Sequence, residues 1–291
     1  MPLHLLSSNP SHHLNNVMKI PPFWVKEQAV IKGRKLRLCG SSFESMEQAQ
    51  HALQQKRRLW QEYLENPALF ASFTEQLRAM EARPEESEYS VTVAEPIVSQ
   101  IDAQNIITRN RYGSLVLNSE SLCFVDVDSF RDSFLRRLFG MARNPEALLL
   151  NAVRQLCAAD ESLSARVYRT ARGWRVVLRG QGISVNSPRM YELFAALQAD
   201  YLYTNLCKKQ HCWRARLSPK PFRLGLPRFP FITDSVQADA QMADWVAAYE
   251  QKVSSFGVCR LLDSFGPAIQ DAVLELHDSY TRALVPDLRL S

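Results

Sequence analysis

The sequence predicts an α+β fold in which a split βαββαβ core follows a smaller N-terminal region. Two observations lead to this prediction. From residue 122 onward, short apolar runs and longer runs with helical spacing alternate in the order strand, helix, hairpin, helix, strand. Before residue 89 the pattern is that of one hairpin and two helices, and the charged, proline-containing stretch 83–88 separates the two parts. We therefore predict an accessory region at 1–88 and a core domain at 89–291.

The bulk composition favours a soluble, cytoplasmic protein with no membrane partner. With 291 residues and 46% hydrophobic content, the chain can bury a substantial core. No apolar run approaches the roughly 18 residues that indicate a membrane span. The first 16 residues are polar and do not resemble a secretion leader. Six cysteines are scattered and mostly lie in apolar segments, which favours reduced core thiols over a disulfide framework.

Local signals define the elements of the N-terminal region. Residues 25–38 are predicted to form a hairpin, because two alternating runs flank a turn at Lys32-Gly33-Arg34. A helix is expected to begin after Ser45, with Gln48 three residues further on as a capping box, and to end at Asn66-Pro67. A second helix is predicted over 68–82.

The core is predicted from the same kinds of signal. Turns at Tyr112-Gly113 and Arg172-Gly173 separate strand-like runs. The predicted strands are 89–94, 105–108, 114–117, 122–127, 165–171, 174–179 and 257–263. The predicted helices are 145–158, 188–199, 238–252 and 267–283. From residue 122 this order matches ferredoxin-like and RNA-recognition-like (RRM-like) cores, with a basic insertion at 200–235 before the last strand.

Positive charge is concentrated in two stretches that contain no acidic residue. Residues 162–190 carry six arginines, and residues 201–233 carry seven lysines and arginines together with His211, although the whole chain has a net charge of only +5. A concentrated basic surface attracts phosphate groups. The sequence therefore predicts a nucleic acid or a nucleotide as the partner.

Two carboxylates lie next to each other on a predicted apolar strand. Residues two apart on a strand share a face, so Asp126 and Asp128 project together with Phe124, while Val125 and Val127 face the core. Carboxylates held this close repel each other unless a cation lies between them, and Mg²⁺ or Mn²⁺ fits such a pair. The alternative is structural: Asp128 caps the next helix and Asp126 pairs with an arginine.

The hairpin around residue 173 and the turn at 108–113 supply further candidate phosphate ligands. An exposed Trp174 beside guanidinium groups would be a stacking platform for a base, and a Trp174 buried in the core is the alternative. Guanidinium groups at a turn suit bidentate contacts to phosphate, or they bridge to Asp126 and Asp128. The candidate nucleotide or phosphate ligands are Arg109, Arg111, Arg169, Arg172, Trp174 and Arg175.

The basic insertion is a candidate groove for a nucleic-acid backbone, because aromatic residues Trp213 and Phe222 are interleaved with its charges. The candidate nucleic-acid ligands are Lys208, Lys209, His211, Arg214, Arg216, Lys220 and Arg223. A solvated surface patch is the alternative. Cys207, His211 and Cys212 leave a zinc site open, but a closed site needs four ligands, and the alternative is that the cysteines are core thiols or a loop cysteine.

Two polar positions near the C-terminus are also candidates. Asp263 ends the predicted last strand, so it is a candidate third catalytic carboxylate beside Asp126 and Asp128. His277-Asp278 on the terminal helix would form either an acid–base couple or an exposed helical pair.

Two motifs resemble those of the archaeo-eukaryotic primase-like superfamily. Asp126-Val127-Asp128 at a strand end is similar to its metal-binding acidic pair, and the segment 169–175 resembles its small-residue-x-His hairpin. The likeness covers roughly residues 122–263. In that superfamily the hairpin histidine contacts the phosphates of the incoming nucleotide, whereas this chain has Trp174 or Arg175 at the matching position. The blocks 108–113, 124–128, 168–173 and 214–223 also resemble those of an uncharacterised bacterial protein family.

The sequence leaves three functional hypotheses. The first is a nucleotide- or nucleic-acid-directed protein with a primase-like core, such as a divalent-metal nucleotidyltransferase or phosphodiester-directed enzyme, in which Asp126 and Asp128 hold the metal. The second is a non-catalytic RNA- or DNA-binding module in which the acidic pair is structural. The third is an interaction scaffold whose basic face meets an acidic protein.

Overall fold

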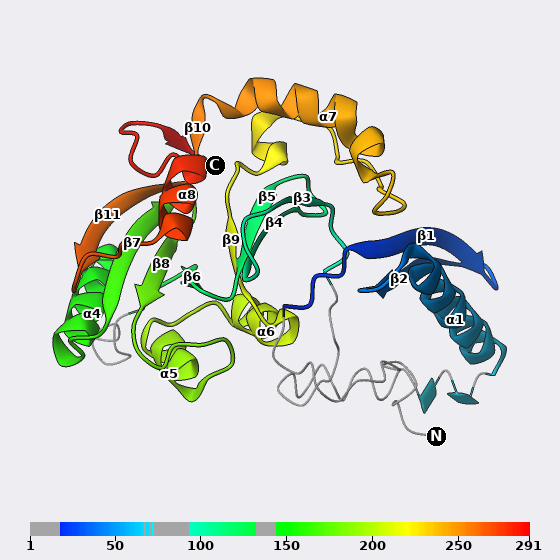
Figure 1. The fold of residues 1–291 in the computed structure, drawn as a ribbon, viewed down its shortest axis with the longest axis horizontal. Helices are drawn as coiled ribbons and strands as arrows, with labels where there is room; N and C mark the ends of the chain where they lie inside the picture. Colours follow the sequence, from blue (N-terminus) through cyan, green and yellow to red (C-terminus); the bar gives the residue numbers. More distant parts are fainter. Residues whose placement is uncertain (1–17, 67, 70, 73–92, 132–143) are drawn as a thin grey trace. The chain divides into compact units, whose positions relative to one another are not determined.

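The computed structural model describes residues 18–66, 68–69, 71–72, 93–131 and 144–291 (Figure 1). They form two compact units. The first comprises the described part of residues 1–96 together with residues 230–243, and the second comprises the described part of residues 97–229 together with residues 244–291. The predicted boundary at 83–88 lies outside the described residues.

The first unit is built on the predicted hairpin. Strands β1 (Phe23–Ile31) and β2 (Arg34–Ser42) pair antiparallel. The two turn residues, Lys32 and Gly33, have φ values of 50° and 77°. Positive φ at both positions is what a two-residue turn of matching twist requires, so glycine suits the second position.

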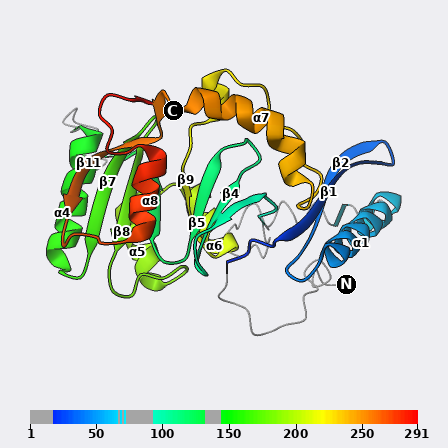
Figure 2. The ribbon, with the colours of Figure 1, turned by 45° about the horizontal axis from the view of Figure 1, so that its top comes forward.

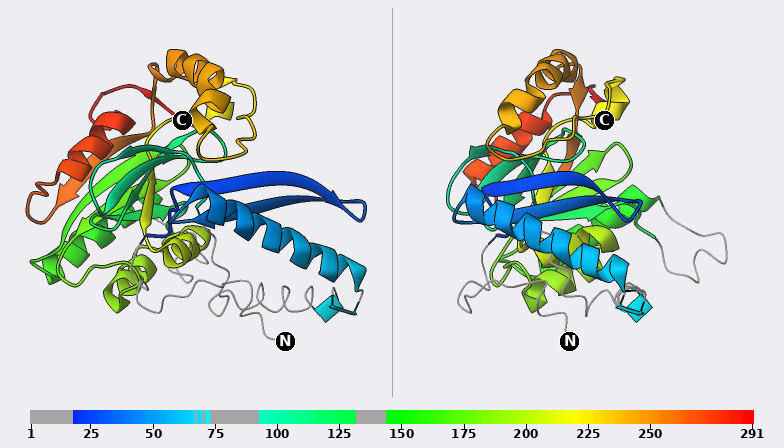
Figure 3. Two further views of the ribbon diagram at one scale, coloured as in Figure 1. Left: turned by 45° about the vertical axis from the view of Figure 1, so that its right-hand side comes forward. Right: turned by 90° about the vertical axis from the view of Figure 1, so that its right-hand side faces the viewer.

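Helix α1 (Met46–Glu65) packs on this hairpin (Figure 3). The predicted start is confirmed: the Ser45 hydroxyl accepts a hydrogen bond from the backbone N–H of Gln48 at 3.2 Å. The helix ends before Asn66-Pro67, as predicted. Gly40 allows the close approach of β2, because a Cβ there would lie 2.1 Å from the carbonyl oxygen of Ala49. The predicted second helix, 68–82, lies almost wholly outside the described residues.

The second unit contains two four-stranded antiparallel sheets. In the first sheet the strand order is β3-β4-β5-β9. These strands are β3 (Ile97–Gln100), β4 (Asn105–Arg109), β5 (Leu115–Ser119) and β9 (Trp213–Arg216). Strands β4 and β5 confirm the predicted runs at 105–108 and 114–117. The predicted strand 89–94 has no strand at residues 93–94, and its other residues lie outside the described chain.

In the second sheet the strand order is β11-β7-β8-β6. These strands are β6 (Cys123–Val127), β7 (Ser164–Thr170), β8 (Trp174–Arg179) and β11 (Cys259–Phe265). All four were predicted, within a few residues at their ends. The last strand of this sheet in chain order, β11, pairs with β7 rather than with β6, so the β7–β8 hairpin is central and β6 is an edge strand. The class is mixed α+β, as predicted.

Helices cover both faces of this second sheet (Figure 2). Helix α4 (Pro145–Ala159) lies on the face of Trp174, whose indole N–H donates to Glu146 at 3.1 Å. Helix α8 (Ala272–Thr281) lies on the opposite face, where its His277 approaches Arg175. Neighbouring residues on a strand point to opposite faces, so these two contacts assign the helices to the two sides. The sheet is therefore the centre of the largest hydrophobic cluster.

Apart from the short C-terminal strand, the remaining elements lie between β8 and β11 in the sequence. Helices α5 (Pro188–Ala196) and α7 (Ala238–Val253) match the predicted helices at 188–199 and 238–252. Within the predicted basic insertion the chain forms helix α6, strand β9 and a short 3-10 helix, η2. Two further short strands, β10 and β12, pair in parallel. Their bounds are α6 (Tyr201–Gln210), η2 (Pro221–Leu224), β10 (Phe256–Gly257) and β12 (Arg289–Leu290).

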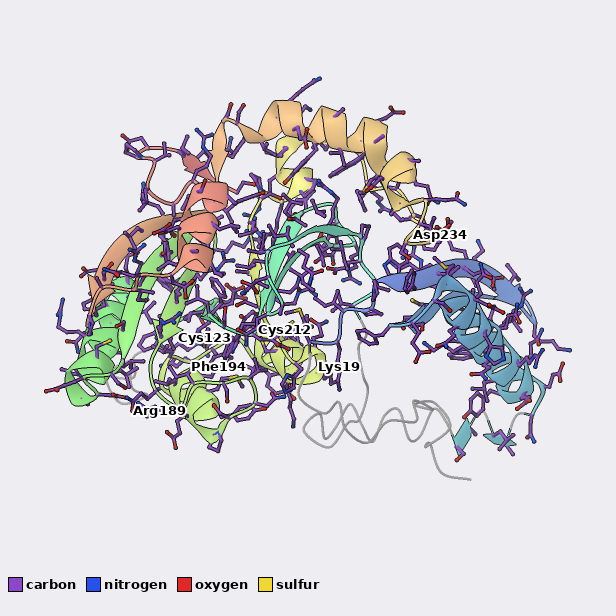
Figure 4. All side chains as sticks on the ribbon, viewed as in Figure 1. Lys19, Cys123, Arg189, Phe194, Cys212 and Asp234 are labelled. Carbon is purple, nitrogen blue, oxygen red and sulfur yellow. The ribbon has the colours of Figure 1, made fainter. Side chains whose placement is uncertain are left out.

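All six cysteines are free thiols, and five of them are buried. Burial raises the pKa of the Cys207 thiol to about 12. Figure 4 shows Cys123 on β6 and Cys212 at the junction of α6 and β9. Reduced core thiols therefore account for these residues, as the composition indicated. Among the described residues, no helix is long and apolar enough to cross a membrane.

Candidate phosphate-binding site

The strand register places Asp126 opposite a buried arginine. Asp126 on β6 pairs with Arg175 on β8, and residues directly opposite in a sheet share a face. The Arg175 Nε lies 3.7 Å from the Asp126 carboxylate, which is within ion-pair distance but beyond hydrogen-bond distance. The Asp126 side chain remains 42% exposed, whereas that of Arg175 is 4% exposed. The predicted pairing of Asp126 with an arginine is therefore present.

Arg175 is engaged inside the protein rather than directed at solvent. Its Nη1 donates to the carbonyl oxygen of Arg216 on β9 at 3.0 Å, so it connects the second sheet to the first. The same Nη1 lies 3.1 Å from Nε2 of His277. Burial of a guanidinium group is tolerable only with such partners. Arg175 was expected to bind phosphate directly, and the structure instead gives it the role of positioning Asp126 and β9.

A third carboxylate, Asp200, joins the acidic pair, and the sequence analysis missed it. Asp200 is the N-cap of α6, and its backbone N–H donates to the carbonyl oxygen of Asp126 at 2.9 Å. Burial raises the pKa of Asp128, and the neighbouring carboxylates of Asp200 and Asp126 raise it further, while Lys220 and Arg172 oppose the shift. We call Asp126, Asp128 and Asp200 the carboxylate group. The available signal was an aspartate directly before a helical segment.

Helix α6 is held against β6 by a partly buried tyrosine, Tyr203. The Tyr203 hydroxyl donates to the carbonyl oxygen of Phe124 at 2.8 Å and accepts from the backbone N–H of Arg214 at 3.3 Å. Its ring stacks on Phe194 of α5, with ring centroids 6.2 Å apart. These contacts fix the N-terminus of α6, and with it Asp200, at the end of β6.

The β7–β8 turn packs directly on the end of β6. A Cβ on Gly173 would lie 2.2 Å from the carbonyl oxygen of Val127 and 2.9 Å from the Cα of Asp128. Only glycine permits this approach. It brings the exposed Arg172 into the environment of Asp128, whose pKa it lowers. The predicted turn at Arg172-Gly173 thus places a cation beside the acidic pair.

Basic side chains from three segments gather around the carboxylate group. Burial lowers the pKa of Lys220, and the nearby Arg216, Arg223 and Arg172 lower it further, while Asp126 opposes them. Burial and the proximity of Arg175 lower the pKa of Arg216 to about 10. Burial, followed by Arg172, also lowers the pKa of Arg223. Mutual repulsion of this kind shows that the cations are close together. We call Arg172, Arg175, Arg216, Lys220 and Arg223 the basic cluster.

Two buried donors of the basic cluster, Nε of Arg175 and Nη1 of Arg223, have no hydrogen-bond partner among the described residues, and Nε of Arg175 lies near the Asp126 carboxylate. A buried donor left unpaired costs roughly 1–3 kcal/mol, so such groups normally meet a ligand, an ion or water. Arg223 lies on η2 (Pro221–Leu224), next to Lys220. The η2 segment therefore presents an unsatisfied cationic donor within the basic cluster.

Trp174 is buried and does not form the exposed platform that the sequence left open. It is 7% exposed and belongs to the main core cluster. The Arg169 guanidinium carbon lies 4.6 Å from the Trp174 ring centroid, and Arg169 also forms a 3.6 Å ion pair with Glu146. Because Trp174 and Arg175 point to opposite faces, Arg169 and Trp174 lie on the α4 side, away from Asp126. The structure does not bring these two residues to the carboxylate group.

The two arginines of the 108–113 turn have different environments. Arg109 is 5% exposed, and its Nη1 donates to the carbonyl oxygen of Gly113 at 2.8 Å. Its guanidinium carbon lies 5.9 Å from the ring centroid of Tyr249. Arg111 is exposed and lies over its neighbour Tyr112, 4.7 Å from the ring centroid. Arg109 thus contacts the turn and Tyr249, and Arg111 contacts its neighbour Tyr112.

The other candidates of the basic insertion lie where α6 meets β9. Lys208 and Lys209 occupy the last turn of α6, and His211 is its left-handed C-cap with φ 56°. The Nδ1 atom of His211 lies 4.0 Å from Glu120. Arg214 donates to the side-chain oxygen of Gln210 at 3.1 Å. Within the described part of the chain, no group of three or more His, Cys, Asp or Glu side chains is placed to hold a metal ion.

Asp263 is not brought to the carboxylate group. It lies on β11, at the opposite edge of the sheet from β6. Its register partner is Val167 on β7, which pairs in turn with Val176 and then Val125, on the face opposite Asp126. The prediction of Asp263 as a third carboxylate assumed that the last strand lies near the first. The strand order therefore places Asp263 away from the carboxylate group. The third carboxylate beside Asp126 and Asp128 is Asp200 instead.

No family model matches this chain, and no curated protein and no solved structure matches it either.

His277 and Asp278 form a buried network rather than an exposed helical pair. The Asp278 carboxylate accepts hydrogen bonds from Arg166 Nη1 at 2.6 Å and from the Tyr168 hydroxyl at 2.8 Å. His277 Nδ1 lies 2.9 Å from the same carboxylate. Arginine can only donate, so Nε2 of His277 must accept from Arg175, and Nδ1 carries the proton that is donated to Asp278.

Burial lowers the pKa of His277 to about 4, although Asp278 opposes the shift. The imidazole is therefore neutral at pH 7, as its hydrogen bonds require. His277 and Asp278 are both buried, and His277 contacts Arg175, which in turn contacts Asp126 of the carboxylate group.

Proposed function

We propose that the protein binds the phosphate groups of a nucleic acid or a nucleotide at the basic cluster. The observation that carries this proposal is the mutual repulsion of the cluster: burial and the neighbouring arginines lower the pKa of Lys220, and Arg223 has a buried donor with no partner among the described residues. Like charges held together weaken the isolated fold, and a polyanion offsets that repulsion. Phosphate oxygens are also the acceptors that guanidinium groups bind best.

The concentration of charge in the sequence supports the same class of ligand. All five cations come from the two acid-free stretches that were expected to bind phosphate directly, and one of them, Arg175, acts by positioning β9. An acidic protein would be met by a broader exposed surface, whereas all of these groups except Arg172 are at least partly buried, and they converge on one place. The acidic residues Asp126 and Asp128 keep the cluster ordered, as the non-catalytic hypothesis requires.

Binding is tested by fluorescence anisotropy with a labelled mixed-sequence oligonucleotide over a series of salt concentrations. Lys220→Gln removes one cation, so we expect weaker binding for every sequence and a decrease of about 0.7 in the slope of log affinity against log salt for a single strand. Arg223→Gln is expected to act in the same direction.

The matched control is Arg260→Gln, which removes the same charge from β11, the strand at the other edge of the sheet. It should leave affinity and salt slope close to those of the parent. If Lys220→Gln, Arg223→Gln and Arg260→Gln all behave alike, the basic cluster is not the phosphate site.

A second candidate function is metal-dependent phosphoryl or nucleotidyl transfer, which the carboxylate group favours. Mg²⁺ is commonly held by one or two carboxylates together with substrate phosphates, so Asp126 and Asp128 fit such an ion beside the basic cluster without a third protein ligand. The raised pKa of Asp128, caused by burial and by Asp200 and Asp126, is the repulsion that a cation would relieve. A bound divalent ion would supply charge neutralisation at the transferring phosphate.

The second candidate predicts a metal effect that pure binding does not. Isothermal titration with Mn²⁺ and a nucleoside triphosphate is expected to show joint binding in the parent, and Asp128→Asn is expected to weaken the Mn²⁺-dependent part at least tenfold. Asp263→Asn, on the far edge strand, serves as the control. Equal oligonucleotide and nucleotide affinity with Mn²⁺ and with chelator would reject the metal-dependent function and leave the binding function standing.

The primase-like arrangement stays a proposal. Support comes from the acidic pair at the end of β6 and from the Arg172-Gly173 turn packed against it. Two features differ from what the resemblance implies: no histidine lies in the hairpin, and β11 lies beside β7 rather than β6.

A further inference from the structure

Phe222 is a large aromatic side chain held out in solvent beside the basic cluster. It is 64% exposed, whereas Leu224, two residues further along η2, is 8% exposed and packs with Trp245 and Tyr249. Scattered exposed apolar side chains are ordinary on protein surfaces. Phe222 differs from other exposed apolar side chains because it lies between Lys220 and Arg223 of the basic cluster.

The η2 segment holds Phe222 in a rigid position. Pro219 and Pro221 restrict the backbone before it, and Gly225 ends the 3-10 turn with φ 67° while its N–H bonds to the carbonyl oxygen of Phe222. The Tyr249 hydroxyl donates to the carbonyl oxygen of Pro219 at 2.6 Å. A ring presented by a fixed backbone loses little conformational entropy when a ligand covers it.

The ring is next to the cations that would hold phosphates. The Arg223 guanidinium carbon lies 5.8 Å from the Phe222 ring centroid, and Arg172 lowers the pKa of Arg223 in addition to the effect of burial, which places the hairpin turn close by. Lys220 belongs to the same cluster. An exposed aromatic face with phosphate-binding cations beside it is the combination that binds unpaired nucleotides, because every base has a face that can stack.

We infer that the ligand of the basic cluster is a single-stranded nucleic acid, one of whose bases stacks on Phe222. This inference rests on the proposed function and narrows its ligand. In a duplex the bases are stacked on each other and their faces are not available to a side chain on the protein surface. The other aromatic side chains that the sequence offered, Trp174 and Trp213, are 7% and 1% exposed, which leaves Phe222 as the platform among those three.

The test compares a labelled 12-nucleotide single strand with a duplex of equal length, by fluorescence anisotropy on the full chain. Phe222→Ala is expected to weaken single-strand binding roughly 5- to 150-fold, the range that one base–aromatic stack contributes. Duplex binding by the parent is expected to be weaker and to be unchanged by Phe222→Ala. Phe222→Trp, which keeps a stacking face, is expected to restore single-strand affinity.

Phe43→Ala is the matched control, because Phe43 is 53% exposed and lies in the other compact unit. Its single-strand affinity should equal that of the parent, and thermal unfolding of both variants should match the parent since neither ring is buried. Unchanged single-strand affinity in Phe222→Ala, or an equal loss for single strand and duplex, overturns the inference.

The binding measurements distinguish a failure of the stacking inference from a failure of the proposed phosphate-binding function. If Lys220→Gln weakens binding while Phe222→Ala does not, the phosphate site stands and the stacking is rejected. If the parent binds neither oligonucleotide at low salt, both are rejected.

Discussion

Replacement of Asp278 by alanine is expected to lower the free energy of unfolding by about 3–5 kcal/mol, the cost of breaking a buried ion pair by removing one partner. Asp278 is 5% exposed and accepts from Arg166, Tyr168 and His277. Without it, these three donors lose their acceptor, and Tyr168 and His277 are fully buried, while the Arg166 side chain is 27% exposed. The measurement is urea unfolding followed by circular dichroism, in which the midpoint should fall at an unchanged slope.

Two variants locate the source of this effect. Tyr168→Phe removes one hydroxyl donor and leaves the ion pair with Arg166, so we expect a loss of about 1–2 kcal/mol. Glu275→Ala removes an exposed carboxylate from the same helix, and we expect a loss of less than about 1 kcal/mol from its interaction with the helix N-terminus. If Asp278→Ala costs no more than Glu275→Ala, the buried network contributes nothing to stability.

Stability is expected to fall as the pH drops from about 6.5 towards 4, because of His277. Burial lowers the pKa of His277 to about 4, against an ordinary value of 6.5. Between these two values the unfolded chain binds a proton at this position and the folded chain does not, so acid favours unfolding. The stabilising contribution is complete above pH 6.5 and is lost as the pH approaches 4. At 1.36 kcal/mol per pH unit, the loss is roughly 3 kcal/mol.

The groups around His277 are consistent with this direction. Arg175 and Arg166 lower its pKa further, and Asp278 raises it without compensating for burial. Urea unfolding of the parent and of His277→Gln at pH 7 and pH 4.5 measures the effect: the glutamine variant should lose less stability on acidification than the parent. His51→Gln, at an exposed position on α1, should retain the full pH dependence. Equal pH dependence in the parent and in His277→Gln would contradict the prediction.

The buried network matters for the candidate site because it holds Arg175. Loss of His277 or Asp278 frees a buried guanidinium that otherwise pairs with Asp126 and with the carbonyl oxygen of Arg216. We therefore regard α8 as the support of the site, while the β7–β8 turn, α6 and η2 supply the side chains that a ligand would meet. This division gives α8 a structural task, which its buried pair performs: a neutral His277 imidazole and the Asp278 carboxylate.

Much of the secondary structure was predictable because its signals are local. Gly33 in a two-residue turn, Ser45 at an N-cap and Asn66-Pro67 at a helix end act through neighbouring residues alone. Helix α6 was missed, although Asp200 provides its N-cap, because charge in the 201–233 segment was more conspicuous than its weak helical periodicity. Strand β3 was missed because it is short and lies at the edge of its sheet.

The composition of the candidate site was predicted in part. The pair Asp126 and Asp128, and the cations Arg172, Lys220 and Arg223, could be selected from charge spacing alone. Which arginine becomes buried depends on strand register, so the position of Arg175 opposite Asp126 could not be derived from the sequence. The inclusion of Asp200 and the exclusion of Asp263 depend on which strands are neighbours, a property set by contacts between residues far apart in the chain.

The amino-acid sequence by itself determined the mixed α+β class, the bounds of most helices and strands, and the concentration of positive charge near an acidic pair. These properties follow from local backbone preferences and from counting charges. Only the tertiary structure decided that Trp174 and His277 are buried, that Phe222 is exposed, and that β11 lies beside β7. Burial and strand order arise from packing one apolar face against another. This packing depends on contacts between residues that are far apart in the sequence.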